Sequence, residues 1–250
     1  MVDHRDRADE PPSATSGSRA LAMALAASGQ TEEAKAQIER CLFLEPYSAE
    51  VLEVYASILR AARDLAAVEA HFGSLLECAS ADVRALARLE LAHVRVERGL
   101  YSDAVEQLQT GLAELVEARA ASRFFGPLRA LLGGCLYRLR DFEGARGSLH
   151  LAIPVLEAAG DREGVADTLT VLSLVERSTD RWDRSEALAL QALGTFRDLV
   201  NPFKVLAVTN NLAVLRSFRG WFESAIDPAQ RAVSLSDEVG DTRMKTSARQ

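Results

Sequence analysis

The chain has 250 residues, a formal net charge of −7 and 48% hydrophobic residues, which is enough for one large domain or two ordinary ones. Charged residues make up 26% of the chain, an ordinary share for a globular protein, so wholesale disorder is excluded. The acidic balance also excludes a general affinity for nucleic acid or for anionic membrane surfaces. Abundant alanine and leucine, with only 7 prolines and 15 glycines, favour helices over a sheet-rich fold.

The N-terminal segment predicts a disordered tail and no export signal. Residues 1–15 are polar and contain the adjacent prolines Pro11 and Pro12, a composition typical of disorder. The apolar run Ala20–Ala27 is short, rich in alanine and not preceded by a basic segment, so it does not resemble a signal peptide. No run reaches the roughly 18 apolar residues that a membrane span requires. We expect one helical domain over residues 16–250.

A short turn pattern recurs six times along this domain. Each copy begins with a turn and closes with a small or branched residue. The copies are Gly29–Ala34, Arg63–Val68, Gly99–Ala104, Arg140–Ala145, Asp180–Ser185 and Gly220–Ala225. The closing residues stand at 34, 68, 104, 145, 185 and 225, so their spacings are 34, 36, 41, 40 and 40. Repeats of this length indicate a solenoid built from one supersecondary unit.

A second pattern lies upstream of each turn, where a large residue is followed by a small one. The pairs are Leu21-Ala22, Tyr55-Ala56, Leu91-Ala92, Leu132-Gly133, Leu172-Ser173 and Leu212-Ala213. Small residues let two helices approach closely while leucines fill the adjacent grooves. Each unit therefore predicts two amphipathic helices joined by a short turn. Asp241–Gln250 begins a further helix, interpreted either as a solvated cap or as the start of a longer array.

The two patterns together resemble the tetratricopeptide repeat. The later units, with their longer period, are similar to the variant found in kinesin light chains and bacterial regulators, and Thr209–Ala225 (TNNLAVLRSFRGWFESA) carries the likeness most fully. The resemblance implies an all-α fold, a right-handed superhelical solenoid of six antiparallel helix pairs plus a terminal helix. It also implies a concave groove lined by the first helix of each pair.

Groove positions follow from this resemblance, residue by residue. The expected partner-binding residues are Arg60, His93, Tyr137, Arg138, Thr170, Arg177, Asn210, Asn211 and Phe218. An asparagine amide offers a donor and an acceptor, so Asn210 and Asn211 could pair with the backbone of an extended peptide. Alternatively, the two amides bond to a neighbouring helix or to water.

Three arginines bear on the chemistry of the partner. If Arg60, Arg138 and Arg177 lie along the groove, they favour an acidic peptide or a free carboxylate. In the alternative interpretation each pairs with a nearby carboxylate on the solvent-facing side and contributes little.

Signals of catalysis or cofactor binding are missing from the sequence. There is no P-loop, dinucleotide fingerprint, nucleophile elbow or HExxH motif. His71 and Cys78 lie seven residues apart, but no second pair completes a metal site. Three widely spaced cysteines do not form a disulfide framework and suit a reducing cytoplasm.

The sequence therefore predicts a non-catalytic cytoplasmic scaffold that binds a protein or peptide, without a cofactor, a metal, nucleic acid or a membrane. Lysine occurs only at Lys35, Lys204 and Lys245, an arginine bias that points to a GC-rich bacterial genome. The alternative is the sensor segment of a bacterial transcriptional or signalling regulator, which would bind a signal peptide or a small effector. The oligomeric state is left open.

Overall fold

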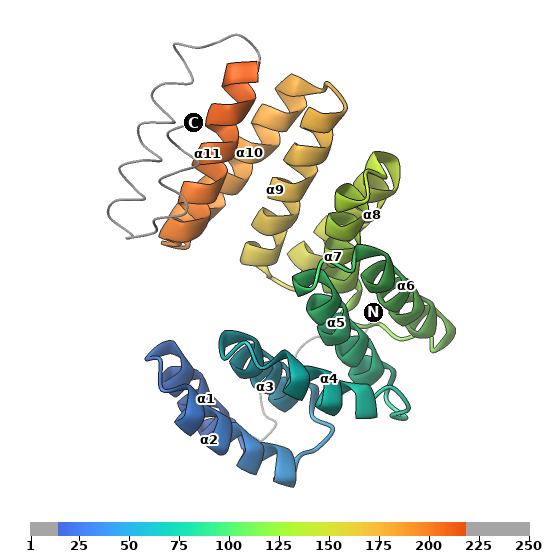
Figure 1. The fold of residues 1–250 in the computed structure, drawn as a ribbon, viewed down its shortest axis with the longest axis vertical. Helices are drawn as coiled ribbons and strands as arrows, with labels where there is room; N and C mark the ends of the chain where they lie inside the picture. Colours follow the sequence, from blue (N-terminus) through green and yellow to red (C-terminus); the bar gives the residue numbers. More distant parts are fainter. Residues whose placement is uncertain (1–14, 219–250) are drawn as a thin grey trace, which may run out of the picture. The chain divides into compact units, whose positions relative to one another are not determined.

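In the computed structural model, which describes residues 15–218, α-helices follow one another along the chain and these residues contain no strand (Figure 1). The helices are α1 (Ser16–Ala27), α2 (Thr31–Leu44), α3 (Ala49–Ala61), α4 (Leu65–Ser74), α5 (Ala81–Glu97), α6 (Tyr101–Glu117), α7 (Phe125–Arg138), α8 (Phe142–Ala158), α9 (Arg162–Ser178), α10 (Trp182–Asp198) and α11 (Pro202–Phe218). The predicted all-α repeat fold is confirmed.

The chain divides into two compact units between Arg98 and Gly99. The N-terminal unit contains α1–α5, and the described part of the C-terminal unit contains α6–α11. The division falls inside the third predicted helix pair, and the single domain over 16–250 stays a prediction. The tail at residues 1–14, the sixth turn at Gly220–Ala225 and the terminal helix after Asp241 lie outside the described residues.

Polar caps start several of the helices where the turn pattern supplies an aspartate. The Asp141 carboxylate accepts a hydrogen bond from the Gly144 backbone N–H at 2.9 Å, and Asp161 accepts one from Gly164 at 2.8 Å. Such caps satisfy N–H groups that have no partner within the helix. The turn pattern therefore sets where the second helix of a pair begins.

The helices end on residues in the left-handed backbone region, and these residues explain the change of repeat length. In chain order they are Gly29, Arg63, Gly99, Arg119, Arg140, Gly160, Asp180 and Val200. From Gly99 onwards their spacings are 20, 21, 20, 20 and 20 residues, so one helix and one turn occupy about 20 residues. Earlier helices are shorter: α4 has 10 residues, whereas α9 and α10 have 17 each.

Val200 is the residue in this series whose side chain suits its backbone least. Its φ is +53° and its side chain is 84% exposed, so a β-branched residue occupies a left-handed position without burying its methyl groups. We expect Val200→Gly to raise the free energy of unfolding by about 1 kcal/mol, measured by urea denaturation. Val116→Gly is the control, because Val116 is exposed but helical and glycine destabilises helices. Destabilisation by Val200→Gly would contradict the interpretation.

Small residues lie at the helix crossings, as the repeat pattern predicts. Ala34, Ala104 and Ala145 are completely buried. At Gly133 a Cβ atom would stand only 2.5 Å from Leu149 Cγ, so the contact between α7 and α8 leaves no room for a side chain there. The pattern thus marks the places where the helices of a pair approach most closely.

A buried ion pair joins α8 to α9 in the C-terminal unit. Glu176 has no exposed side-chain surface, and its Oε1 accepts a hydrogen bond from Arg146 Nε at 2.9 Å. Arg146 also donates to Thr179 Oγ1 at 2.8 Å. Arg181 lies farther away, with its Nη1 3.6 Å from Glu176 Oε2. The pair is therefore a hydrogen-bonded network that depends on Arg146.

Candidate functional site

The first helices of the N-terminal unit border two cavities. Helix α3 contacts both α1 and α5. The cavity between α3 and α5 has a volume of about 240 Å³ and is lined by Arg60, Arg63, Leu65, His93, Val94 and Glu97. The cavity between α1 and α3 has a volume of about 490 Å³ and includes Ser57 on its wall. Because Ser57 and Arg60 are one turn apart on α3, the two cavities lie on either side of this helix.

Two predicted groove residues, Arg60 and His93, meet in the α3–α5 cavity. The Arg60 guanidinium forms an ion pair with Glu90 of α5, whose side chain is only 4% exposed. Burial raises the pKa of Glu90, and the charge of Arg60 opposes that rise. Arg60 is thus both a wall of the cavity and the partner of a buried carboxylate 30 residues away.

His93 is held in its neutral form. Burial lowers the pKa of its imidazole to about 4, and the nearby charge of Arg60 contributes to the same shift. A neutral imidazole presents one N–H donor and one acceptor nitrogen. The downward contribution of Arg60 also indicates a positive potential at the ring.

The shifted pKa of His93 predicts a pH dependence of stability. An unfolded histidine has a pKa near 6.5, so the unfolded chain takes up this proton first as the pH falls. Between about 6.5 and about 4 the free energy of unfolding should therefore decrease as the pH is lowered. We expect His93→Gln to reduce this slope in urea titrations. An unchanged slope would contradict the burial of His93. His71 remains in both proteins, and burial lowers its pKa too.

Arg63, Leu65 and Val94 complete the cavity but were not predicted. Arg63 has a φ of +57° and ends α3, and no carboxylate of residues 15–218 forms an ion pair with it. Leu65 begins α4, and Val94 follows His93 on α5. The resemblance directed attention to the first helices, whereas Arg63 lies in the turn. The repeated turn pattern beginning at Arg63 was the available signal.

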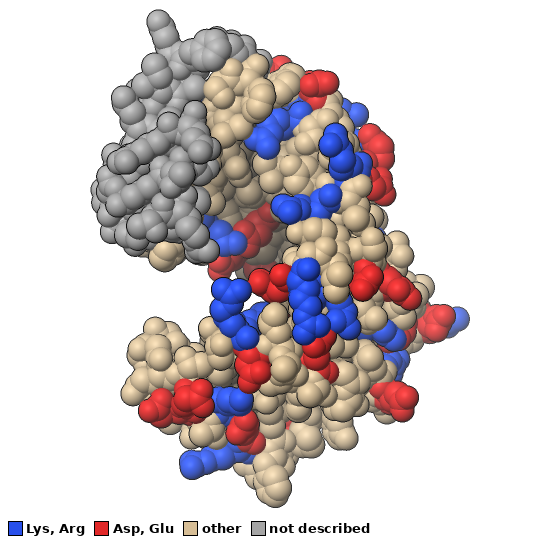
Figure 2. All heavy atoms as spheres, in the orientation of Figure 1, with Lys and Arg blue, Asp and Glu red and all other residues tan. Residues whose placement is uncertain are grey.

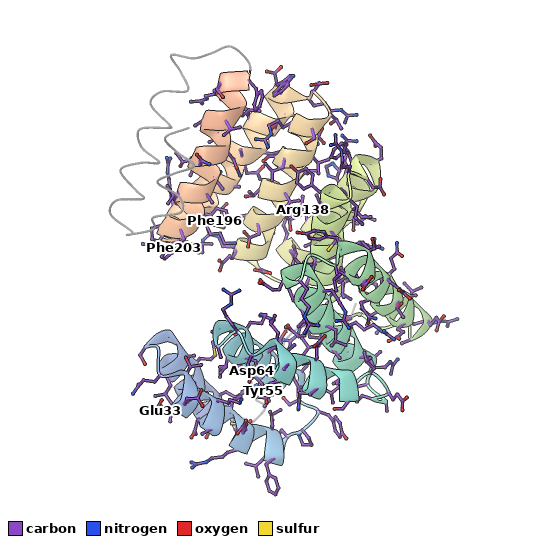
Figure 3. All side chains as sticks on the ribbon, viewed as in Figure 1. Glu33, Tyr55, Asp64, Arg138, Phe196 and Phe203 are labelled. Carbon is purple, nitrogen blue, oxygen red and sulfur yellow. The ribbon has the colours of Figure 1, made fainter. Side chains whose placement is uncertain are left out.

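In the C-terminal unit, Tyr137 and Arg138 lie at the end of α7 (Figure 3). The Tyr137 ring packs against Phe142 of α8, with 6.1 Å between ring centroids, and is partly buried beside the core. The Arg138 guanidinium lies 5.1 Å from the centroid of the Tyr101 ring. Both side chains therefore make contacts with the following or preceding helix.

Thr170 and Arg177 lie on α9 and are partly buried. The Thr170 hydroxyl donates to the Ala166 carbonyl at 2.8 Å, a bond within its own helix. Arg177 forms no ion pair with a carboxylate of residues 15–218. On this helix Arg177 is the predicted residue whose polar head is not engaged by such a pair.

The last three predicted residues lie on α11. Asn210 and Asn211 are partly buried, and Asn210 has an interaction partner. Phe218 is 71% exposed at the end of the described chain. The structure thus places Arg60 and His93 at one cavity and distributes the other predicted residues over α7, α9 and α11 of the C-terminal unit.

The surface carries both signs of charge. Figure 2 shows acidic and basic side chains intermixed on the visible face rather than separated into two large patches. Within residues 15–218, no three His, Cys, Asp or Glu side chains gather as metal ligands would. Among the described helices, none combines the length and the apolarity that crossing a membrane demands.

Comparison with protein families confirms the resemblance to the tetratricopeptide repeat. Residues 16–58 match the family model described as tetratricopeptide repeat. This segment covers α1, α2 and most of α3. No curated protein sequence matches the chain.

Solved structures share the fold at low sequence identity. BtubC (BKLC) from P. vanneervenii has a TM-score of 0.66 and 20% identity, over 92% of this chain and 93% of that one. The nearly identical TPR-like repeats of a Podosopora anserina protein described as a kinesin light chain give 0.54 and 14%, over 94% and 100%. YrrB, described as a TPR protein with an unusual peptide-binding site, gives 0.52 and 16%, over 85% and 97%.

Proposed function

We propose that this chain, a helical-repeat protein similar to tetratricopeptide repeat proteins, is a non-catalytic scaffold that binds a segment of a partner protein. The binding face consists of the first helices α1, α3 and α5 of the N-terminal unit. The observation that carries the proposal is the cavity of about 240 Å³ between α3 and α5, which contains two of the predicted residues. Its volume suits one side chain of a bound segment rather than a whole small-molecule substrate.

The chemistry of the cavity favours an acidic residue of the partner. Glu90 holds Arg60 in place, so little side-chain freedom is lost when Arg60 receives a further acceptor. Arg63 adds a second guanidinium, and guanidinium groups form charge-assisted hydrogen bonds with carboxylates. A neutral His93 can donate its N–H to the same group. Glu97 lies on the wall as the opposing charge and would restrict how the acidic side chain enters.

The other predicted residues extend this proposal to the C-terminal unit. Arg177, Asn210 and Asn211 are proposed to contact the same or a second segment, because they are polar and lie on first helices of their pairs. YrrB, which has a peptide-binding site by its description, shares the fold and supports peptides as the ligand class. A bacterial cytoplasm is the proposed location, supported by three free cysteines, of which Cys41 and Cys135 are buried.

The proposal is tested by selecting a library of random dodecapeptides on phage against the whole chain. We expect the retained sequences to be enriched in aspartate or glutamate, and we expect Arg63→Gln to reduce that enrichment. Arg63 is exposed and bonds to no buried carboxylate, so this change should leave the fold intact, as checked by circular dichroism.

Arg40→Gln is the matched control, because Arg40 is an exposed arginine on α2, outside both cavities. The control should retain the same peptides as the unmodified chain. A library that yields no reproducible peptides, or peptides whose retention ignores Arg63, would overturn the proposed site.

A further inference from the structure

The α1–α3 cavity is the larger of the two, at about 490 Å³, and none of its α1 residues was predicted as a groove residue. Ala20 and Met23 of α1 face Val54 of α3 across it. These side chains provide an apolar wall, and Met23 is 57% exposed. Methionine adapts its shape readily to an apolar chain placed against it.

Acidic groups outnumber basic ones on the lining of this cavity. Glu50 and Glu53 are its carboxylates and Arg19 is its cation, which gives a formal sum of −1 from two negative charges and one positive charge. The Ser48 hydroxyl donates a hydrogen bond to Glu50 at 3.0 Å. Both carboxylates interact within the chain, so they are held at the cavity rather than moving freely in solvent.

We propose that this cavity binds a lysine or arginine side chain of the same partner segment whose acidic residue enters the α3–α5 cavity. The inference rests on the proposed function. Long basic side chains lay their methylene groups along apolar surface while the charged head stays near water or carboxylates. Ala20, Met23 and Val54 receive the methylene groups, and the excess negative charge attracts the head.

The spacing of the two cavities limits the partner sequence. Adjacent packed helices have axes about 8–10 Å apart, and α3 separates the two cavities. An extended or polyproline chain advances roughly 3.1–3.4 Å per residue. The basic and acidic residues of the partner should therefore stand about two to four positions apart.

The exposed Ser57 lies on α3 at the edge of the α1–α3 cavity, one turn before Arg60. A segment that joins the two cavities must cross α3 near this point. The small hydroxyl side chain leaves room for the backbone of such a segment and can bond to it. A bulky residue at position 57 should therefore weaken binding of any segment that uses both cavities.

The test continues the same phage selection and then measures single peptides. Peptides retained by the whole chain should combine an acidic residue with a lysine or arginine two to four positions away. Against Glu53→Gln, the preference for the basic residue should disappear while the preference for the acidic residue persists. Glu33→Gln is the matched control, because Glu33 is an exposed carboxylate on α2, away from both cavities (Figure 3).

A double-mutant cycle with one retained, fluorescein-labelled peptide then measures the coupling. Replacing the basic residue of the peptide by glutamine should weaken the Kd about two- to fivefold for the unmodified chain. The same replacement should change the Kd by much less for Glu53→Gln. Circular dichroism and the retained acidic preference of Glu53→Gln show that the variant is folded.

Each alternative outcome is decisive. Retained peptides that carry acidic residues without a basic neighbour, or that place an apolar or acidic residue in its stead, overturn this inference and leave the proposed function standing. Equal coupling in Glu53→Gln and the unmodified chain also overturns it. Failure to retain acidic peptides at all overturns the proposed function itself.

Discussion

Replacing Arg146 by leucine is expected to lower the free energy of unfolding by about 3–5 kcal/mol, because the change leaves a buried carboxylate without its hydrogen-bonded partner. Glu176 is fully buried, and Arg146 Nε is its donor at 2.9 Å. Arg181 and Arg184 lie 3.6 Å and 4.0 Å from the carboxylate oxygens and are more than half exposed, so they compensate weakly. Urea denaturation followed by circular dichroism measures the effect.

Two further variants separate the buried charge from general damage. Arg162→Leu removes an arginine from the exposed pair with Asp198 and should cost no more than about 1 kcal/mol. Arg146→Leu combined with Glu176→Leu should be more stable than Arg146→Leu alone, because the second change removes the unpaired charge. If Arg146→Leu were as mild as Arg162→Leu, the buried pair would not be an essential part of the C-terminal unit.

The second large effect is expected at Phe196. Its side chain has no exposed surface and packs in the cluster formed by α9, α10 and α11, with Ala166, Leu193 and Leu212. Truncation to alanine removes this aromatic ring and leaves a cavity between helices, which should lower the free energy of unfolding by about 3–5 kcal/mol. Thermal or urea denaturation of Phe196→Ala measures the loss.

Phe203 supplies the matched control, because it has the same side chain and lies at the start of the next helix (Figure 3). It is 60% exposed, so Phe203→Ala should change stability by less than about 1 kcal/mol. Similar losses in both variants would mean that Phe196 is not the central contact of the α9–α11 cluster.

Much of the fold could be predicted because the repeat is written into local sequence. The closing residues Ala34, Val68, Ala104 and Ala145 are all fully buried, as expected for positions where helices cross. Left-handed residues such as Gly99 and Gly160 end the helices at the places where the turn pattern begins or a glycine occurs. Such signals act over a few residues, so periodicity is sufficient to find them.

The candidate site could be predicted only in part, because its geometry depends on contacts between distant residues. Arg60 and His93 were named from their helix positions, but the pairing of Arg60 with Glu90 joins residues 30 positions apart. That pairing decides which face the guanidinium presents and contributes to lowering the pKa of His93. The contribution of the turn residue Arg63 depends on how α3 and α5 pack, which no local pattern specifies.

The regular placement of left-handed residues has a consequence for how such a chain can grow. Between Gly99 and Val200 these residues recur at intervals of 20 or 21, so every duplication of about 40 residues carries two complete helices with their own termination signals. Recombination within the coding sequence could then add or delete a whole pair without shifting the phase of its neighbours. The length of the C-terminal array is therefore a quantity that evolution can change in discrete steps, while the shorter repeats around the two cavities would not tolerate an exchange of this size.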